Sequence, residues 1–312
     1  MTRAPPLVAG RTRVQHLPRV SSALGAEVWV KREDETHAQI GGTKIRKLSP
    51  LLADAAARGA THLLTIGAIG SNHVLATAVH GAAAGFDVIA ALVPHPTSAS
   101  VIASADMAAA SGARSLAARN EPHAVLRIAL EALRLRRRGA RPYFIPPGGT
   151  SSISVPGCAA GGAELAEQVT TGELPGWPAA AFCAMGSGGT AAGLWAALSA
   201  ARAPTVLHAV RVYPSVLIGP AYLARLARRV RPEHGFPRAT LRIDATQLGG
   251  GYGAPTDAGR QAQQLFATDG VDLDLTYTAK AAAALISFAR GEGRGQRLLL
   301  WYSAPGALKQ LR

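Results

Sequence analysis

The chain has 312 residues, of which 48% are hydrophobic, and carries a formal net charge of +14 at pH 7. Its length suits one large α/β domain or two lobes, and its composition excludes a disordered tail. Residues 1–20 contain no continuous apolar run, so we expect neither a signal peptide nor a membrane span, and a cytoplasmic location. Cys158 and Cys183 lie in Ala/Gly-rich runs. We expect them to be buried and reduced, and we expect no metal site.

Most of the positive charge comes from arginine, which clusters at residues 134–141 and 225–231. Such a basic patch can bind nucleic acid through its phosphates. Aromatic residues that would stack on bases are not interleaved with either cluster. We therefore expect solvated helix faces that steer anionic substrates, and no nucleic-acid partner.

Apolar strands alternate with helices along the first half of the chain. In order, the pattern predicts a strand at 28–31, a helix at 49–59, a strand at 61–66, a helix at 74–85, a strand at 87–93, helices at 98–111 and 122–138, and a strand at 142–146. A strand, a glycine turn, a helix and a strand in succession form the parallel βαβ unit.

The second half begins after a polar, Gly/Ser-rich connection at residues 148–157, which we interpret as the passage from one lobe to the other. Beyond it we predict helices at 159–170, 191–201, 218–230, 256–268 and 279–290, and strands at 179–185, 206–213 and 297–302. Residues 247–255 form a glycine-dense loop. This alternation predicts parallel sheets with helices on both faces.

One lysine stands between a glycine pair and a helix-compatible apolar run, in the segment Gly41-Gly42-Thr43-Lys44-Ile45-Arg46-Lys47-Leu48. A lysine that forms a Schiff base must lose its proton near neutral pH, which desolvation or neighbouring positive charge favours. Arg46 and Lys47 supply such charge to Lys44. The same residues also suit a solvated basic turn that opens a helix.

Two glycine or polar turns lie where a predicted strand meets a predicted helix. Gly186-Ser187-Gly188-Gly189-Thr190 offers backbone N–H groups to a phosphate, and its spacing matches neither a Walker loop nor the dinucleotide fingerprint. Ser71-Asn72-His73 suits an anion such as a substrate carboxylate, although Ser71 would also serve simply as a helix cap. His73 suits acid/base chemistry or a hydrogen bond.

Two tyrosines occupy loop positions. Tyr252 lies among glycines in the segment Gly249-Gly250-Gly251-Tyr252-Gly253, which is typical of a backbone close to a ligand. Tyr277 precedes a predicted helix in the segment from Asp274 to Lys280. Either phenol suits acid/base chemistry or stacking on a cofactor, and packing is the alternative.

Six motifs occur here in one order: Gly-Gly-x-Lys-x-Arg-Lys, Ser-Asn-His, Pro-x-Gly-Gly-Thr, Gly-Ser-Gly-Gly-Thr, Gly-Tyr-Gly and Asp-x-x-Tyr-Thr-x-Lys. In these motifs, over roughly residues 8 to 306, the chain resembles the family of D-cysteine desulfhydrases and 1-aminocyclopropane-1-carboxylate (ACC) deaminases. These are pyridoxal-phosphate (PLP) enzymes of the tryptophan synthase β-like fold, PLP fold type II.

The resemblance implies a two-lobed α/β architecture. Residues 1–48 and 156–312 would form a large PLP-binding domain, and residues 49–155 a small inserted domain. It also implies pyridoxal 5'-phosphate as the cofactor, a small amino acid as the substrate and a homodimer as the assembly.

The resemblance also implies roles for individual residues. Lys44 would form the Schiff base with the cofactor and move the Cα proton, with Ser71, Tyr252 and Tyr277 completing the catalytic set. The binding residues would be Gly186, Ser187, Gly188, Gly189 and Thr190 for the phosphate, Asn72, Tyr277 and Ser303 for the cofactor ring, and Ser71, Asn72, His73 and Tyr252 for the substrate.

Thr278 favours one reaction within the family. The ACC deaminases have a glutamate there, whose carboxylate would keep the pyridine nitrogen protonated and strengthen the electron sink, and threonine cannot do so. A weaker sink suits loss of a good leaving group. We therefore predict α,β-elimination from a β-substituted, D-cysteine-like amino acid, giving a keto acid and ammonia. ACC ring opening, β-replacement, racemisation and a non-catalytic anion-binding role are the alternatives.

The chain departs from the family pattern at a few positions. Thr43, Gly70 and Leu75 stand where the family usually has asparagine, glutamine and arginine, and Trp301-Tyr302-Ser303-Ala304 replaces His-Thr-Gly-Gly. These departures are compatible with a relative that acts on another amino acid.

Overall fold

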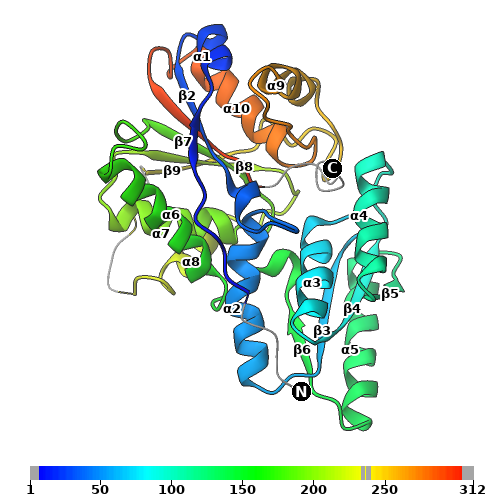
Figure 1. The fold of residues 1–312 in the computed structure, drawn as a ribbon. Coiled ribbons are helices and arrows are strands. Elements are labelled where there is room, and N and C mark those ends of the chain that lie inside the picture. Colours follow the sequence, from blue (N-terminus) through cyan, green and yellow to red (C-terminus); the bar gives the residue numbers. More distant parts are fainter. Residues whose placement is uncertain (1–6, 233–235, 237–239, 304–312) are drawn as a thin grey trace. The chain divides into compact units, whose positions relative to one another are not determined.

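The structure is a computed structural model that describes residues 7–232, 236 and 240–303 (Figure 1). By their contacts, the described residues divide into two compact units. The larger unit contains residues 10–43 and 155–303, and the smaller unit contains residues 7–9 and 44–154. The assignment of a PLP-binding domain and an inserted domain stays a prediction.

The larger unit is built on a six-stranded sheet in the order β1-β2-β10-β7-β8-β9. These strands are β1 (Val14–His16), β2 (Glu27–Lys31), β7 (Ala180–Met185), β8 (Val206–Arg211), β9 (Leu241–Asp244) and β10 (Arg297–Trp301). Every neighbouring pair is parallel except β1 and β2. The segments that follow β7 and β10 therefore leave the sheet at the same edge, on adjacent strands.

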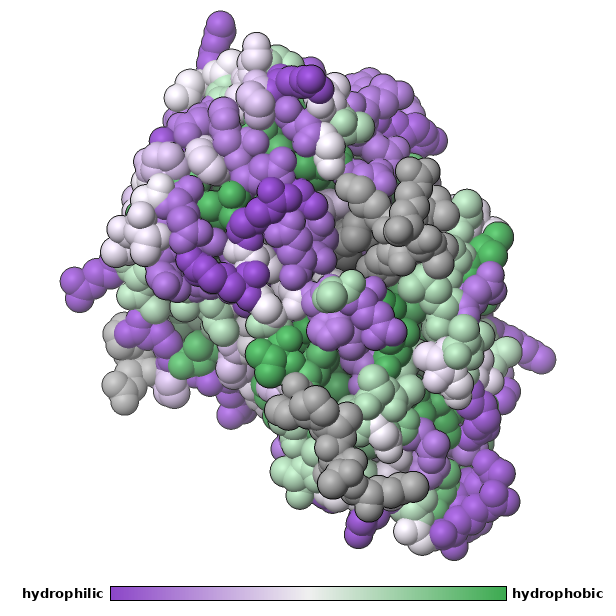
Figure 2. Space-filling view, viewed as in Figure 1, coloured by the Kyte–Doolittle hydropathy of each residue, from purple (hydrophilic) through white to green (hydrophobic). Residues whose placement is uncertain are grey.

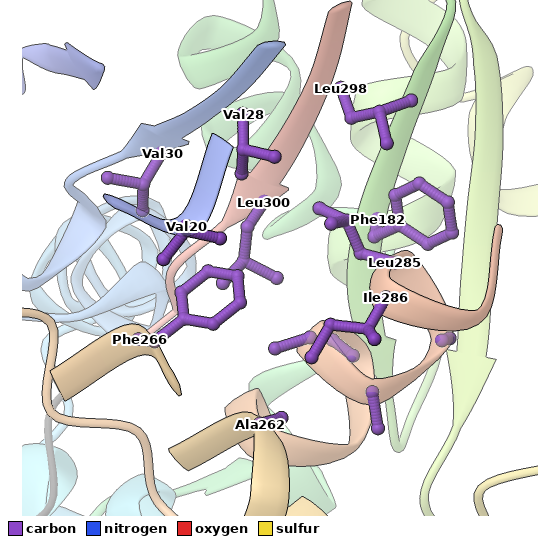
Figure 3. Close-up of a cluster of buried hydrophobic side chains, with 14 of the residues drawn as sticks. Val20, Val28, Val30, Phe182, Ala262, Phe266, Leu285, Ile286, Leu298 and Leu300 are labelled. Carbon is purple, nitrogen blue, oxygen red and sulfur yellow. The ribbon is translucent and has the colours of Figure 1, made fainter. Parts of the chain in front are cut away.

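Helices cover both faces of this sheet. One face packs on α1 (Pro18–Leu24), α9 (Asp257–Ala267) and α10 (Thr278–Arg290), and the other on α6 (Val155–Thr170), α7 (Gly189–Ala200) and α8 (Pro220–Ala227). Successive β10 residues alternate between the two cores, because a strand's side chains point to opposite faces in turn. Leu298 and Leu300 lie in the first core with Phe182 and Phe266 (Figure 3), and Leu299 lies in the second.

The smaller unit contains a parallel four-stranded sheet in the order β5-β4-β3-β6. Its elements are α2 (Thr43–Ala57), β3 (His62–Ala68), α3 (Asn72–Ala83), β4 (Asp87–Val93), α4 (Ala99–Ala110), β5 (Arg114–Ala117), α5 (Glu121–Arg137) and β6 (Pro142–Ile145). Helices α2 and α3 share a core with Leu63, whereas α5 packs with Leu64 on the opposite face. The predicted α/β class, with parallel sheets covered on both faces, is confirmed.

The first arginine cluster forms a solvated helix end. Arg134, Arg136 and Arg137 are exposed in the last turn of α5, and Figure 2 shows hydrophilic residues over this end of the helix.

Cys158 and Cys183 are buried and not joined in a disulfide. No helix among the described residues has the length and apolar character needed to cross a membrane. Within the same residues, His, Cys, Asp and Glu side chains form no group of three that would hold a metal ion.

The sequence pattern missed short or solvated elements. β1, α1, β5 and β9 were not predicted, because they contain three, seven, four and four residues with few buried side chains. Helices α2 and α6 begin earlier than predicted, at Thr43 and Val155, since the polar Lys44 segment and the glycines of 156–162 masked their helical period. Two short 3₁₀ turns, η1 (Glu33–Glu35) and η2 (Pro147–Gly149), were also not expected.

Candidate active site

Lys44 lies in the first turn of α2, where its side chain is half-buried. Its Nζ is 3.3 Å from the carbonyl oxygen of Gly148, in the η2 turn. Lys47, one turn further along, places its Nζ 3.4 Å from the same carbonyl and 3.1 Å from Thr150 Oγ1. The helix thus directs two amines toward one backbone turn, because residues three apart share a helix face.

The residue before Lys44 is fixed by the end of β10. The Thr43 N–H donates to the Ser303 carbonyl at 2.7 Å, and the buried Trp301 indole N–H donates to Thr43 Oγ1 at 3.1 Å. Thr43 and Trp301 are two of the departures from the family pattern. These two replacements are thus in direct contact within the larger unit.

Ser71-Asn72-His73 forms the N-terminus of α3, as predicted. Ser71 is the N-cap, and its hydroxyl accepts from the His73 backbone N–H at 3.2 Å. The preceding Gly70 has φ +74°, and a Cβ there would lie 2.7 Å from the Val101 backbone. A glutamine at position 70 would therefore need a rearrangement of α4, which accounts for this departure from the family pattern.

His73 is buried and makes a defined hydrogen bond. Its Nε2 is 2.8 Å from the Thr65 hydroxyl, which itself donates to the Ile145 carbonyl at 2.9 Å. Because the single hydroxyl proton is used on Ile145, the His73 Nε2–H must donate to Thr65. Burial, followed by the charges of Lys44 and Lys47, lowers the pKa of His73 well below its ordinary value. His73 is thus neutral at pH 7, with its unprotonated Nδ1 beside Gly149.

The second group of predicted residues lies in the larger unit, and begins with the glycine turn from β7 to α7. Gly188 is the N-cap of α7, with φ +82°. A Cβ on Gly188 would lie 2.8 Å from Leu223 Cδ2, so both conformation and space require glycine. The N–H groups that open α7 have no acceptor within the helix, so they suit a phosphate dianion. This local structure fits the phosphate of PLP.

Tyr252 and Tyr277 are brought together as a hydrogen-bonded phenol pair. Burial, and then the neighbouring Tyr252, raise the pKa of Tyr277 well above its ordinary value. Gly186 lies against this pair, since a Cβ built on it would be 3.9 Å from the Tyr277 ring. The glycine turn and Tyr277 are therefore neighbours within the larger unit.

Asp274 organises the start of α10, a role that sequence reasoning missed. Its carboxylate accepts from the backbone N–H groups of Thr276, Tyr277 and Thr278 at 2.7–3.0 Å, and from Thr278 Oγ1 at 2.6 Å. Burial raises the pKa of Asp274, which these hydrogen bonds oppose. Thr278 is thus a buried partner of Asp274 and brings no charge of its own.

The structure therefore places the predicted residues in two groups, one in each unit. Lys44, Ser71, Asn72 and His73 belong to the smaller unit, and the glycine turn, Tyr252, Tyr277 and Ser303 to the larger unit. Only the backbone of Ser303 has a described contact. Ala304 lies outside the described residues. The contacts of Gly148 and Thr150 were missed, although the Pro-x-Gly-Gly-Thr motif was the available signal.

Comparison with known proteins agrees with this fold. The family model described as "Pyridoxal-phosphate dependent enzyme" matches residues 6–303. The D-cysteine desulfhydrases of Salmonella choleraesuis and Salmonella newport are each 35% identical to this chain over 301 residues, covering 92% of this chain and 89% of theirs.

Solved structures show the same fold. A crystal structure described as an ACC deaminase homologue has a TM-score of 0.84 and 29% identity, covering 99% of this chain and 95% of its own. O-ureido-L-serine synthase, at 17% identity and a TM-score of 0.68, covers 97% of this chain and 91% of its own, and shows the fold alone.

The fold, the glycine turn and the amine at the start of α2 define a cofactor-dependent enzyme of α/β architecture. The chain belongs to the family of pyridoxal-phosphate dependent enzymes. Within that family it is similar to D-cysteine desulfhydrases and to an ACC deaminase homologue. The predicted family resemblance, fold type and cofactor are confirmed.

Proposed function

We propose that this enzyme catalyses α,β-elimination on a small β-substituted amino acid, with D-cysteine as the first candidate, and releases a keto acid and ammonia. The observation that carries the proposal is the arrangement at Lys44, whose amine lies beside Lys47 and a neutral His73. Similarity to D-cysteine desulfhydrases over 92% of the chain supports the substrate class.

The residues fit the cofactor as follows. Lys44 would carry PLP covalently, Gly186 to Thr190 would bind its phosphate through the α7 N-terminus, and Asn72, Tyr277 and Ser303 would contact its ring. When bound, the cofactor supplies the electron sink that stabilises negative charge at the substrate Cα.

The protein's own groups would then hold the substrate and move its protons. Ser71 and the N–H groups of Asn72 and His73 would bind the substrate carboxylate at the positive end of α3, with the His73 N–H exchanging its Ser71 acceptor for the substrate. The Lys44 amine would take the Cα proton.

The tyrosine pair would donate a proton to the leaving group. Either hydroxyl of the pair can donate, and the raised pKa keeps Tyr277 protonated, so its proton is available for a bond to the Tyr252 oxygen. We propose that Tyr277 donates to Tyr252 during the reaction, which leaves the Tyr252 proton for the β-thiolate as it departs. Thr278 supports elimination over ring opening, because it is an uncharged partner of Asp274 and gives no carboxylate to the cofactor ring.

The first test is the absorption spectrum of the purified enzyme beside Lys44→Ala, with Lys47→Ala as the matched control. We expect a violet-to-blue band from the lysine-bound cofactor in the wild type and in Lys47→Ala, and none in Lys44→Ala. Keto-acid release from D-cysteine should fall by about 10²–10⁴-fold or more in Lys44→Ala. A band that survives in Lys44→Ala would contradict the role of Lys44.

ACC deamination is a second candidate, favoured by the TM-score of 0.84 to the ACC deaminase homologue. Product analysis separates the two reactions, since ACC gives α-ketobutyrate whereas D-cysteine gives pyruvate and sulfide. Activity on ACC with none on D- or L-cysteine would replace elimination by ring opening.

We also propose that the enzyme is a cytoplasmic homodimer. Val125, Leu126, Leu130 and Leu133 of α5 are between 45% and 57% exposed, and a partner subunit would bury apolar surface of this kind. Sedimentation velocity measures the oligomeric state, and cell fractionation the location.

A further inference from the structure

Lys280 is a buried lysine that the proposed reaction does not use. It lies in the first turn of α10 with 0% of its surface exposed. Its ammonium donates to two backbone carbonyls, of Leu248 at 2.9 Å and of Gly251 at 3.3 Å. Among the described residues it has no carboxylate within ion-pair distance.

Two physical effects disfavour a cation at this position. Burial removes water from the ammonium and lowers its pKa, an effect that the charge of Asp274 only partly opposes. The N-terminal turn of a helix also carries partial positive charge, so a lysine there is at the unfavourable end. The two carbonyls are therefore the hydrogen-bond acceptors that replace the water lost by the buried amine.

Those carbonyls belong to a loop that has few other constraints. Gly249, Gly251 and Gly253 all have positive φ and bring no side chains that would fix the backbone. Within the loop, the Leu248 carbonyl accepts from the Gly251 N–H and the Gly251 carbonyl accepts from the Ala254 N–H, both at 3.3 Å. Lys280 donates to the same two acceptors, and thus joins both successive turns to α10.

Tyr252 lies inside this clamped segment. Its hydroxyl meets that of Tyr277, three residues before Lys280, and Asp274 fixes the Tyr277 backbone. The two tyrosines are thus held by one short segment, residues 274–280. Asp274 holds the Tyr277 backbone, and Lys280 holds the loop that carries Tyr252.

We propose that Lys280 is the positioning residue that holds the 248–254 loop on α10 and so keeps the Tyr252 hydroxyl on Tyr277. The effect on catalysis rests on the proposed role of Tyr252, whereas the effect on the loop does not.

The test uses two variants. Lys280→Met has a side chain of similar length but no N–H donors, and Lys280→Arg keeps N–H donors at this position. Amide hydrogen exchange of residues 248–254 in the cofactor-free protein should accelerate about tenfold or more in Lys280→Met and return toward the wild-type rate in Lys280→Arg. In the holoenzyme, kcat for keto-acid release should fall about tenfold in Lys280→Met, with a smaller change in KM.

Lys31→Met is the matched control, because Lys31 is also 0% exposed but pairs with Glu164. It should destabilise the protein without faster exchange confined to the loop. Unchanged loop exchange in Lys280→Met overturns the proposal. Faster exchange with unchanged kcat supports the clamp and rejects the role of Tyr252. If Lys280→Met does not fold, Lys280→Gln, which keeps a neutral donor, is measured by the same exchange experiment and must show intermediate protection.

Discussion

His208 is a buried polar residue whose ring belongs to an aromatic cluster. It stacks on Phe182 with ring centroids 4.4 Å apart and meets the edge of Phe288 at 5.0 Å, and its Nε2 has no hydrogen-bond partner. Burial first, and then Arg242, lower the pKa of His208 to about 4, while Asp244 and Glu292 act in the opposite direction. The cluster therefore keeps the imidazole neutral. As the solution becomes acidic, the free energy of unfolding should decrease, because the unfolded chain binds a proton that the folded chain does not.

The sign of the effect follows from proton linkage. Below its unfolded pKa of 6.5, His208 binds a proton in the unfolded chain but stays neutral in the folded chain until about pH 4. His208 should therefore contribute a fall in wild-type stability of roughly 1 kcal/mol per pH unit across this window, after solvent screening. His208→Phe should remove this contribution and leave that of the buried His73, and urea unfolding at pH 7 and pH 5 measures the difference. Parallel pH profiles of the two proteins would contradict the assignment.

At the scale of elements, the glycine turn that opens α7 depends on one backbone conformation. Gly188 and Gly270 both have positive φ, but only at Gly188 would a Cβ contact a neighbour, namely Leu223 at 2.8 Å. Gly270→Ala should thus cost about 1–2 kcal/mol of stability, for left-handed strain alone. Gly188→Ala should cost about 1–3 kcal/mol more, for overpacking. Thermal unfolding of the two cofactor-free variants separates the backbone strain from the steric overlap with Leu223. Equal losses of stability in the two variants would show that Leu223 moves to make room.

The same elements show what a sequence can and cannot predict. The glycine turn and the Ser71 junction were predicted because each follows a continuous apolar strand, whose burial on both faces leaves a clear pattern. The contacts of Lys44 and Lys47 with Gly148 join residues about a hundred positions apart. The donor direction of the Thr65–His73 bond likewise depends on the pairing of β3 with β6, which brings Ile145 beside Thr65. Such contacts leave no local period in the sequence, so only the folded sheet reveals them.

At the scale of the whole molecule, the chain carries a net charge of +14, and its cofactor is a phosphate ester. A positive protein raises the rate at which an anion reaches it, and salt screens this attraction over about 8–10 Å. We therefore expect the second-order rate of PLP binding to the cofactor-free enzyme to fall severalfold between about 20 mM and about 300 mM NaCl.

Pyridoxal is the matched ligand for this experiment, because it carries the same aldehyde and ring without the phosphate dianion. Its rate of binding should change little over the same salt range, since little net charge remains for the protein to attract. Stopped-flow absorbance at the lysine-bound cofactor band follows both reactions. Equal salt dependence for the two ligands would place the effect on the amine chemistry at Lys44 and exclude long-range attraction of the phosphate. A steeper fall for PLP alone would show that the positive charge of the protein serves cofactor capture.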